Sequence, residues 1–196
     1  MVRDKTLTRI KVCVWVLCLL PFLRLLLGAF TGQLGTNPIE LITRSTGTWT
    51  LVLLCCTLAV SPLRQITGWV WLAKLRRLLG LFTYFYVCLH LMTWIWFDQW
   101  FDLNDMIRDV IKRPFITVGM AAFLLLTPLA LTSNKVAMKR LGRRWAVLHR
   151  LVYVIAILAV VHYWWMVKLD ITQPMIYGAV VAALLGWRVW KRLKNQ

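Results

Sequence analysis

Six long apolar stretches dominate this chain, and each approaches the length that a helix needs to cross a bilayer. A hydrocarbon core about 30 Å thick requires about 20 helical residues. Strands of a membrane barrel would be shorter and would alternate in polarity, a pattern absent from this sequence. We therefore expect an all-α membrane protein, a bundle of six transmembrane helices in which the second and sixth gain length from their flanks. The expected helices cover about 12–30, 46–63, 78–97, 115–131, 147–167 and 174–190.

The basic residues follow a pattern that sets the topology. The chain has 24 lysines and arginines against seven acidic residues, a net charge of +17. In a soluble protein this charge would suggest nucleic acid, but here it is concentrated at the N-terminus, in alternate connections and at the C-terminus. This is the positive-inside pattern, and it predicts that both termini are cytoplasmic. The charge indicates contact with anionic membrane lipids and argues against a nucleic-acid partner.

The sequence shows no linker, low-complexity tract or internal repeat, so we expect residues 1–196 to form a single domain. It also lacks a Gly-rich phosphate loop and any soluble flavin, nicotinamide or molybdenum-binding domain. One connection, 98–114, is the most acidic part of the chain and places apolar residues at near-helical spacing. We expect an interfacial helix there, on the outer surface, which either rests on the bilayer or docks a partner.

All three histidines, His90, His149 and His162, fall in or at the edge of predicted membrane helices. Ionisable groups at such positions are costly and tend to mark ion paths, proton relays or cofactors. His90 and His162 each lie in the outer half of an outward-running helix and are therefore matched in depth. Such a pair suits the axial ligands of a b-type haem. The alternatives are a helix–helix hydrogen bond or, less readily, a zinc site, which would need further ligands at that level.

His149 is harder to assign. It lies thirteen residues before His162, roughly 20 Å deeper on a helix, and the two side chains would point about 140° apart. A kink, or a helix start just after His149, is therefore expected. A second ligand would belong about fourteen residues before His90, where the chain has Arg76. The sequence predicts one bis-histidine haem and leaves two interpretations for His149, an asymmetrically ligated second haem or a hydrogen bond.

Arg76 and Arg77 belong to a basic cluster at the predicted cytoplasmic start of the third helix. Such a cluster attracts phosphate groups. The ordinary ligand is the headgroup of an anionic lipid, and the sharper hypothesis is the phosphate of a flavin.

Three stretches carry a resemblance to a known family: "RRLLGLFTYFYVCLHLMTW", "KRPFITVGMAAFLLLTPLALTS" and "LGRRWAVLHRLVYVIAILAVVHYWWMVK". Together they resemble the MsrQ (YedZ) family, the haem-binding membrane subunits of bacterial periplasmic methionine sulfoxide reductase systems. The resemblance covers nearly the whole chain and implies a ferric-reductase-like transmembrane domain. It also implies b-type haem at His90, His149 and His162, with FMN as an associated cofactor. Wider relatives have four haem histidines, and Arg76 stands at the position of the fourth.

The resemblance implies a role in the bacterial inner membrane, as a multi-pass protein that supports repair of oxidised periplasmic proteins. Electrons would come from the quinone pool or a cytosolic flavin reductase and pass to a periplasmic molybdopterin subunit that reduces methionine sulfoxide. The chain itself would be the electron-transfer subunit, not the catalytic one. The rival hypothesis is a small proton-coupled transporter or channel with a histidine relay, which predicts a colourless protein. All seven acidic residues lie outside the apolar runs or at their edges, which disfavours that rival.

Overall fold

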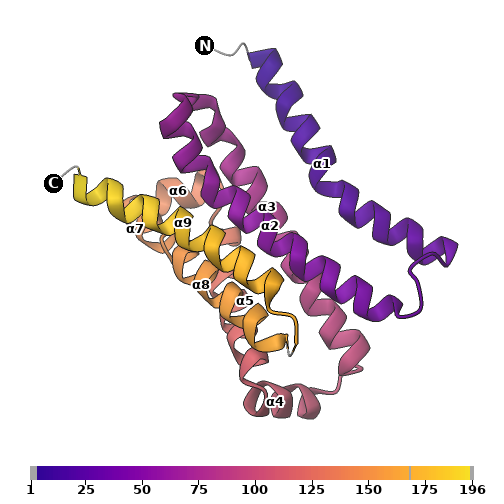
Figure 1. Cartoon of the computed structure of the whole chain (residues 1–196). Helices are drawn as coiled ribbons and strands as arrows, with labels where there is room; N and C mark the ends of the chain where they lie inside the picture. Colours follow the sequence, from indigo (N-terminus) through magenta and orange to yellow (C-terminus); the bar gives the residue numbers. More distant parts are fainter. Residues whose placement is uncertain (1–3, 168, 195–196) are drawn as a thin grey trace. The chain divides into compact units, whose positions relative to one another are not determined.

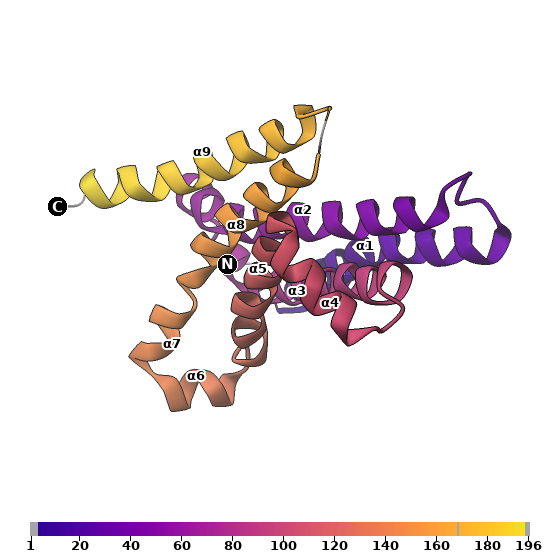
Figure 2. The same cartoon turned by 90° about the horizontal axis from the view of Figure 1, so that it is seen from below.

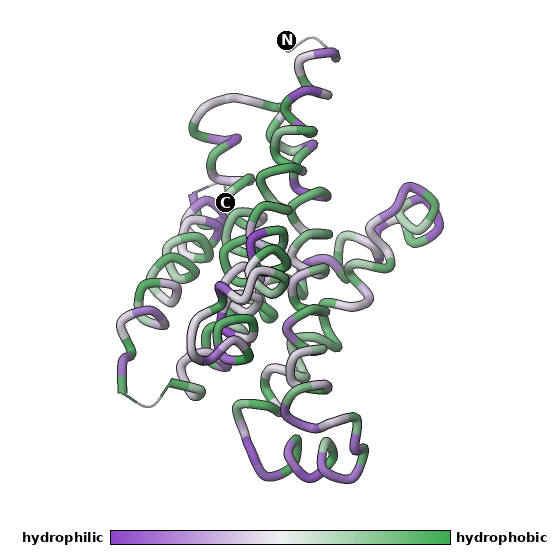
Figure 3. The backbone as a smooth tube through the Cα atoms, turned by 90° about the vertical axis from the view of Figure 1, so that its right-hand side faces the viewer, coloured by the Kyte–Doolittle hydropathy of each residue, from purple (hydrophilic) through white to green (hydrophobic). Residues whose placement is uncertain are grey.

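The computed structural model describes residues 4–167 and 169–194, and within these ranges every regular element is helical. The chain forms two compact units, Met1–Phe101 and Asp102–Gln196, which are described separately here as the N-terminal and C-terminal units. Hydrophobic residues fill long stretches of the helices, and hydrophilic residues gather in the connections (Figure 3).

The N-terminal unit contains three long helices. They are α1 (Asp4–Thr31), α2 (Pro38–Thr67) and α3 (Arg76–Thr93). A 3₁₀ segment, η1 (Val70–Leu75), precedes α3, and a π-helical turn, η2 (Trp94–Asp98), follows it. Helices α2 and α3 form the most extensive helix pair of this unit (Figure 1).

Helix α2 is longer than its apolar run because its ends are capped. The Asn37 side chain accepts a hydrogen bond from the Glu40 backbone N–H at 3.3 Å, and Pro38 occupies the first helical position. Gly68 ends the helix in the left-handed conformation (φ 72°), and its N–H donates to the Arg64 carbonyl. These are the residue types that helix ends favour. The expectation that this helix gains length from its flanks is confirmed.

A tyrosine hydroxyl joins α3 to α1. Pro21 lies inside α1, where a proline ring disturbs the helical hydrogen-bond ladder. One residue later, the Phe22 N–H donates to Tyr86 Oη at 3.1 Å, and Tyr86 Oη donates to the Cys18 carbonyl at 2.7 Å. The hydroxyl therefore lies between the two groups that would form the helical bond from Phe22 to Cys18. Tyr86 is fully buried, in a core with Cys18, Leu53 and Phe82.

The C-terminal unit is built on the pair α5 (Pro114–Leu131) and α8 (Leu151–Met166), and α9 (Thr172–Lys194) packs against α8. A short helix, α4 (Leu103–Lys112), precedes α5. Two more short helices, α6 (Lys135–Leu141) and α7 (Arg143–Leu148), connect α5 to α8 and run in different directions (Figure 2).

The expected helix at 147–167 is interrupted. Helix α7 ends at Leu148, His149 and Arg150 form a turn, and α8 begins at Leu151. The His149 N–H still donates to the Trp145 carbonyl, but the Arg150 N–H donates to the nearer Val147 carbonyl. The helix start just after His149, which the angle between the two histidines requires, is confirmed.

Within the described ranges, five helical segments are long and apolar enough to cross a membrane, and this supports a multi-pass membrane protein. Helix α9 has 23 residues but is not among them. A sixth span therefore stays a prediction, as does the cytoplasmic placement of the termini, whose residues 1–3 and 195–196 lie outside the described ranges. The five segments are Lys5–Thr31, Pro38–Thr67, Val70–Asp98, Pro114–Leu131 and Arg143–Met166.

Candidate haem-ligating site

His90 lies near the end of α3 and packs against α2. Its Nδ1 lies 3.0 Å from the backbone carbonyl oxygen of Thr43. Its ring covers Gly47, one helical turn further along α2, so closely that a Cβ added to this glycine would lie 3.0 Å from His90 Cε1. The Thr46 hydroxyl is also near, at 3.5 Å from Nδ1, but it donates to the Ile42 carbonyl at 2.8 Å.

In the C-terminal unit, His162 also contacts a backbone carbonyl and a glycine of the neighbouring helix. It lies on α8 and packs against α5, with Nδ1 2.7 Å from the Phe115 carbonyl oxygen. Its ring covers Gly119, where an added Cβ would lie 2.8 Å from His162 Nδ1. Both glycines therefore leave room for an imidazole that any larger side chain would displace.

The two arrangements repeat in sequence spacing as well as in geometry. Each histidine lies 47 residues after the residue whose carbonyl it contacts. Each glycine follows that carbonyl residue by one helical turn. The likeness is one of geometry and spacing, because the stretches "TRSTG" (43–47) and "FITVG" (115–119) share only the glycine.

These contacts fix the form of both rings. A carbonyl oxygen only accepts hydrogen bonds, so Nδ1 must carry the proton and donate it. A neutral imidazole then has its lone pair on Nε2. A metal-ligating histidine typically donates its other ring N–H to a carbonyl or carboxylate in this way, which orients the ring and increases its basicity. The donor chemistry of His90 and His162 therefore fits a haem iron.

A cage of protein ligands for zinc is not formed by the residues that the structure describes. Among them, no three His, Cys, Asp or Glu side chains lie close enough together to hold a metal ion. A structural zinc site usually needs four protein ligands, and a catalytic one needs three. The arrangement offers imidazoles as single ligands, which is what a macrocycle that supplies four equatorial nitrogens requires.

His149 has a different environment. Its ring stacks on Trp145, with centroids 4.0 Å apart and planes inclined by 27°. Its Nε2 lies 3.1 Å from Thr132 Oγ1, and that hydroxyl donates to the Pro128 carbonyl at 2.6 Å. The hydroxyl therefore accepts from the ring, so Nε2 carries the proton. Trp145 Nε1 also donates to the Thr132 carbonyl at 3.0 Å, which ties α7 to the end of α5.

The two arginines of the predicted phosphate site lie in different surroundings. Arg76 Nη2 donates to Ser61 Oγ on α2 at 2.6 Å. Arg77 instead lines a groove between α1 and α3 together with Lys11 and Lys74. Sequence reasoning found Arg77 but missed Lys11, which is 66 residues from Arg77 and lines the same groove only through the packing of α1.

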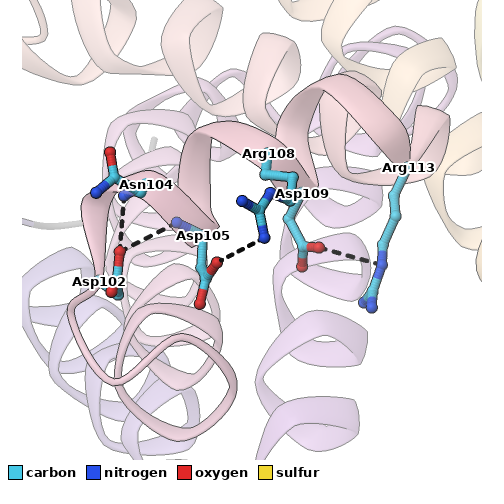
Figure 4. Close-up of polar contacts among 6 residues, drawn as sticks. All are labelled: Asp102, Asn104, Asp105, Arg108, Asp109 and Arg113. Carbon is cyan, nitrogen blue, oxygen red and sulfur yellow. Dashed lines mark hydrogen bonds and ion pairs between the residues drawn. The ribbon is translucent and has the colours of Figure 1, made fainter.

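The segment expected to form an interfacial helix does form a helix, α4, and its place at the membrane interface stays a prediction. The Asp102 carboxylate caps its N-terminus and accepts from the backbone N–H groups of Asn104 and Asp105 at 2.8 and 3.1 Å (Figure 4). Ion pairs join Asp105 to Arg108 at 3.5 Å and Asp109 to Arg113 at 3.3 Å. The helix is strongly amphipathic. Its other surface exposes a stripe of three apolar side chains, Leu103, Ile107 and Ile111.

Comparison with known proteins first defines the class. Residues 46–160, which include His90 and His149 and end two residues before His162, match the family described as "Ferric reductase like transmembrane component". The match spans more than half of the chain, so this is a ferric-reductase-like transmembrane protein. No solved structure matches the chain.

More closely related proteins define the family within that class. A protein of Herminiimonas arsenicoxydans is 58% identical over 96% of this chain and 90% of its own length. Proteins of Ralstonia nicotianae and Azospira oryzae are 54% and 53% identical, each over 97% of this chain and over 89% and 82% of their own lengths. All three are named "Protein-methionine-sulfoxide reductase heme-binding subunit MsrQ". The chain belongs to the MsrQ family, which confirms the resemblance found in the sequence.

Proposed function

We propose that this chain is the haem-binding, electron-transferring membrane subunit of a methionine sulfoxide reductase system. The names of its relatives support the haem and the reductase system. The observation that carries the assignment of ligands is the matched pair of imidazoles. His90 and His162 each donate Nδ1–H to a backbone carbonyl and each cover a glycine on the neighbouring helix. We propose that these two residues would hold one b-type haem.

When bound, haem iron supplies a one-electron redox centre. The protein's part is to present two neutral imidazoles in fixed orientations. The Thr43 and Phe115 carbonyls hold the tautomer that offers Nε2, and the glycines set how far each ring lies from its neighbouring helix. Axial ligands and their hydrogen bonds tune the potential of a haem. With a haem bound, the hydrogen bonds to the two carbonyls would increase the basicity of both imidazoles and would favour the ferric state.

The arrangement around His149 favours one haem per chain. To ligate iron through Nε2, this ring would have to lose its hydrogen bond to Thr132. We propose that His149 orients the junction between α7 and α8, and that a second haem requires rearrangement of Trp145 and Thr132.

The direction of transfer follows from the proposed topology. With six spans and both termini cytoplasmic, electrons enter from the quinone pool or a cytosolic flavin reductase, with FMN as an associated cofactor. They leave on the periplasmic side of the bacterial inner membrane toward a molybdopterin subunit that reduces methionine sulfoxide. Helix α4 is the proposed docking surface, since its ion-paired polar face and its exposed apolar stripe offer two kinds of contact.

Absorption spectroscopy of the purified protein tests the assignment. We expect sharp low-spin b-type bands after dithionite reduction and about one haem per chain in a pyridine haemochrome assay. His90→Ala and His162→Ala should each abolish haem binding and electron delivery to the catalytic subunit, whereas His149→Ala should keep the haem. Wild-type haem content in both of the first two variants would refute the ligand assignment. A colourless wild-type protein after haem-replete expression would instead favour the histidine-relay transporter.

A further inference from the structure

A groove of about 390 Å³ runs between α1 and the start of α3 in the N-terminal unit. One end of it is cationic. Lys11 on α1, Lys74 on η1 and Arg77 on α3 contribute three positive charges, and Thr8 adds a hydroxyl group. None of the eight lining residues is acidic, so these charges are not neutralised within the groove.

The rest of the lining is apolar. Val12 and Trp15 follow Thr8 and Lys11 on the same face of α1, since positions three, four and seven residues apart share a helix face. Leu78 and Leu81 follow Arg77 on α3. Both helices therefore change from cationic to apolar in the same direction, and the apolar part reaches about 10 Å beyond Thr8 at 1.5 Å per residue.

Aromatic residues indicate that the cationic end lies at the level of the membrane interface. Trp69 and Trp71 flank the start of η1, and their rings stack with centroids 5.8 Å apart. Trp69 and Val70 are largely exposed, at 56% and 73%. Tryptophan favours the headgroup region, and an exposed apolar turn beside it avoids water by resting there. Lys74 and Arg77 follow within two turns.

We propose that this groove binds an acidic phospholipid. The headgroup phosphate contacts Lys11, Lys74 and Arg77, and one acyl chain lies along Val12 and Trp15. The charge matches an anion that carries no compensating ammonium group, such as phosphatidylglycerol, better than a zwitterion. Lysine and arginine side chains near an anionic lipid surface attract its headgroups. The inference does not depend on the haem assignment, because its residues are distinct from the histidine sites.

The apolar half of the groove distinguishes a lipid from a flavin phosphate. A flavin ring carries carbonyl and N–H groups that need hydrogen-bond partners when they leave water. Beyond the cationic end, the lining offers alkyl side chains and Trp15. An acyl chain needs nothing more, whereas the several carbonyl and N–H groups of a flavin ring would find there only the Trp15 indole N–H. Flavin binding is therefore an outcome that the test must separate from lipid binding.

Native mass spectrometry of the delipidated full chain tests the proposal. The protein is titrated with dioleoyl phosphatidylglycerol or dioleoyl phosphatidylcholine, in the presence and absence of FMN or inorganic phosphate. We expect one tight phosphatidylglycerol site that phosphatidylcholine fills at least tenfold more weakly. The triple variant Lys11→Gln/Lys74→Gln/Arg77→Gln should lose this preference. A second variant, Val12→Trp, fills the apolar half without changing charge and should weaken binding of phosphatidylglycerol.

The matched control removes three bases elsewhere, as Lys139→Gln/Arg140→Gln/Arg143→Gln in α6 and α7, and should retain the preference. Equal loss in both triple variants would show that only diffuse charge is involved and would overturn the proposal. Equal binding of the two lipids by the wild type would also overturn it, and so would wild-type affinity of Val12→Trp for phosphatidylglycerol. Displacement of phosphatidylglycerol by micromolar FMN would assign the groove to a flavin, and displacement by inorganic phosphate alone would show that the acyl chain contributes nothing.

Discussion

At the scale of single residues, two glycines determine whether the histidine rings keep their orientation. An alanine at position 47 or 119 would place its Cβ 3.0 Å from His90 Cε1 or 2.8 Å from His162 Nδ1. Overpacking of this kind typically costs about 1–3 kcal/mol. Because each ring is also held by a carbonyl, it would have to lose that hydrogen bond to move. We predict that Gly47→Ala and Gly119→Ala each lower haem content at least severalfold, measured by the pyridine haemochrome assay.

Gly80→Ala is the control for both substitutions. Gly80 also lies within a long helix, but its added Cβ would meet only Thr57 Cγ2, at an ordinary 3.9 Å. Haem content should therefore be unchanged. If Gly47→Ala and Gly119→Ala behave like Gly80→Ala, the close contact between glycine and imidazole has no role in holding the ligands.

The inserted hydroxyl of Tyr86 gives a second prediction at this scale. Tyr86→Phe leaves the Phe22 N–H and the Cys18 carbonyl without the group that bridges them. Leaving a buried donor or acceptor unsatisfied costs about 1–3 kcal/mol. We predict a loss of stability of that size, measured by denaturant titration in detergent micelles. Tyr163→Phe serves as the control and should change stability much less. Equal effects of the two substitutions would mean that, without the tyrosine hydroxyl, the Phe22 N–H bonds directly to the Cys18 carbonyl within α1.

At the scale of elements, α4 depends on its cap more than on its ion pairs. Its ten residues are too few to be stable alone in water. Asp102→Ala removes the acceptor for two backbone N–H groups and should cost about 1 kcal/mol. We predict faster hydrogen exchange throughout α4. Asp105→Ala removes only an exposed ion pair with Arg108, which contributes little, and should leave exchange nearly unchanged. The reverse order of effects would contradict this account of the helix.

The elements also show what the sequence could and could not predict. Apolar runs located the five segments that are long and apolar enough to cross a bilayer, because length and hydrophobicity are the properties that a spanning helix needs. The angle between His149 and His162 predicted the break that the structure has at Arg150. The partners of His90 and His162 were not predictable, because the Thr43 and Phe115 carbonyls belong to backbone and lie 47 residues away. The only sequence signal was a glycine one turn beyond each carbonyl.

At the scale of the whole molecule, the topology decides on which side of the membrane electrons enter and leave. The basic segments indicate this topology, because they favour the cytoplasmic side. The α6–α7 segment carries Lys139, Arg140, Arg143 and Arg144, and α9 ends with Lys191, Arg192 and Lys194. With six spans, both basic segments face the cytoplasm. With five, the basic end of α9 lies on the opposite side or at the surface, against the positive-inside rule. The orientation of α9 therefore decides between the two topologies.

Reporter fusions at the C-terminus measure this orientation. Green fluorescent protein fluoresces only in the cytoplasm, and alkaline phosphatase is active only in the periplasm. With α9 as a sixth span, we predict a fluorescent and phosphatase-inactive C-terminus. A fusion that replaces the chain after Asp102 should show the opposite pattern, because it reports the outer connection that contains α4. A phosphatase-active C-terminus would mean that α9 does not return the chain to the cytoplasm. The chain would then have five spans, and the depths of the histidines would have to be inferred from that topology.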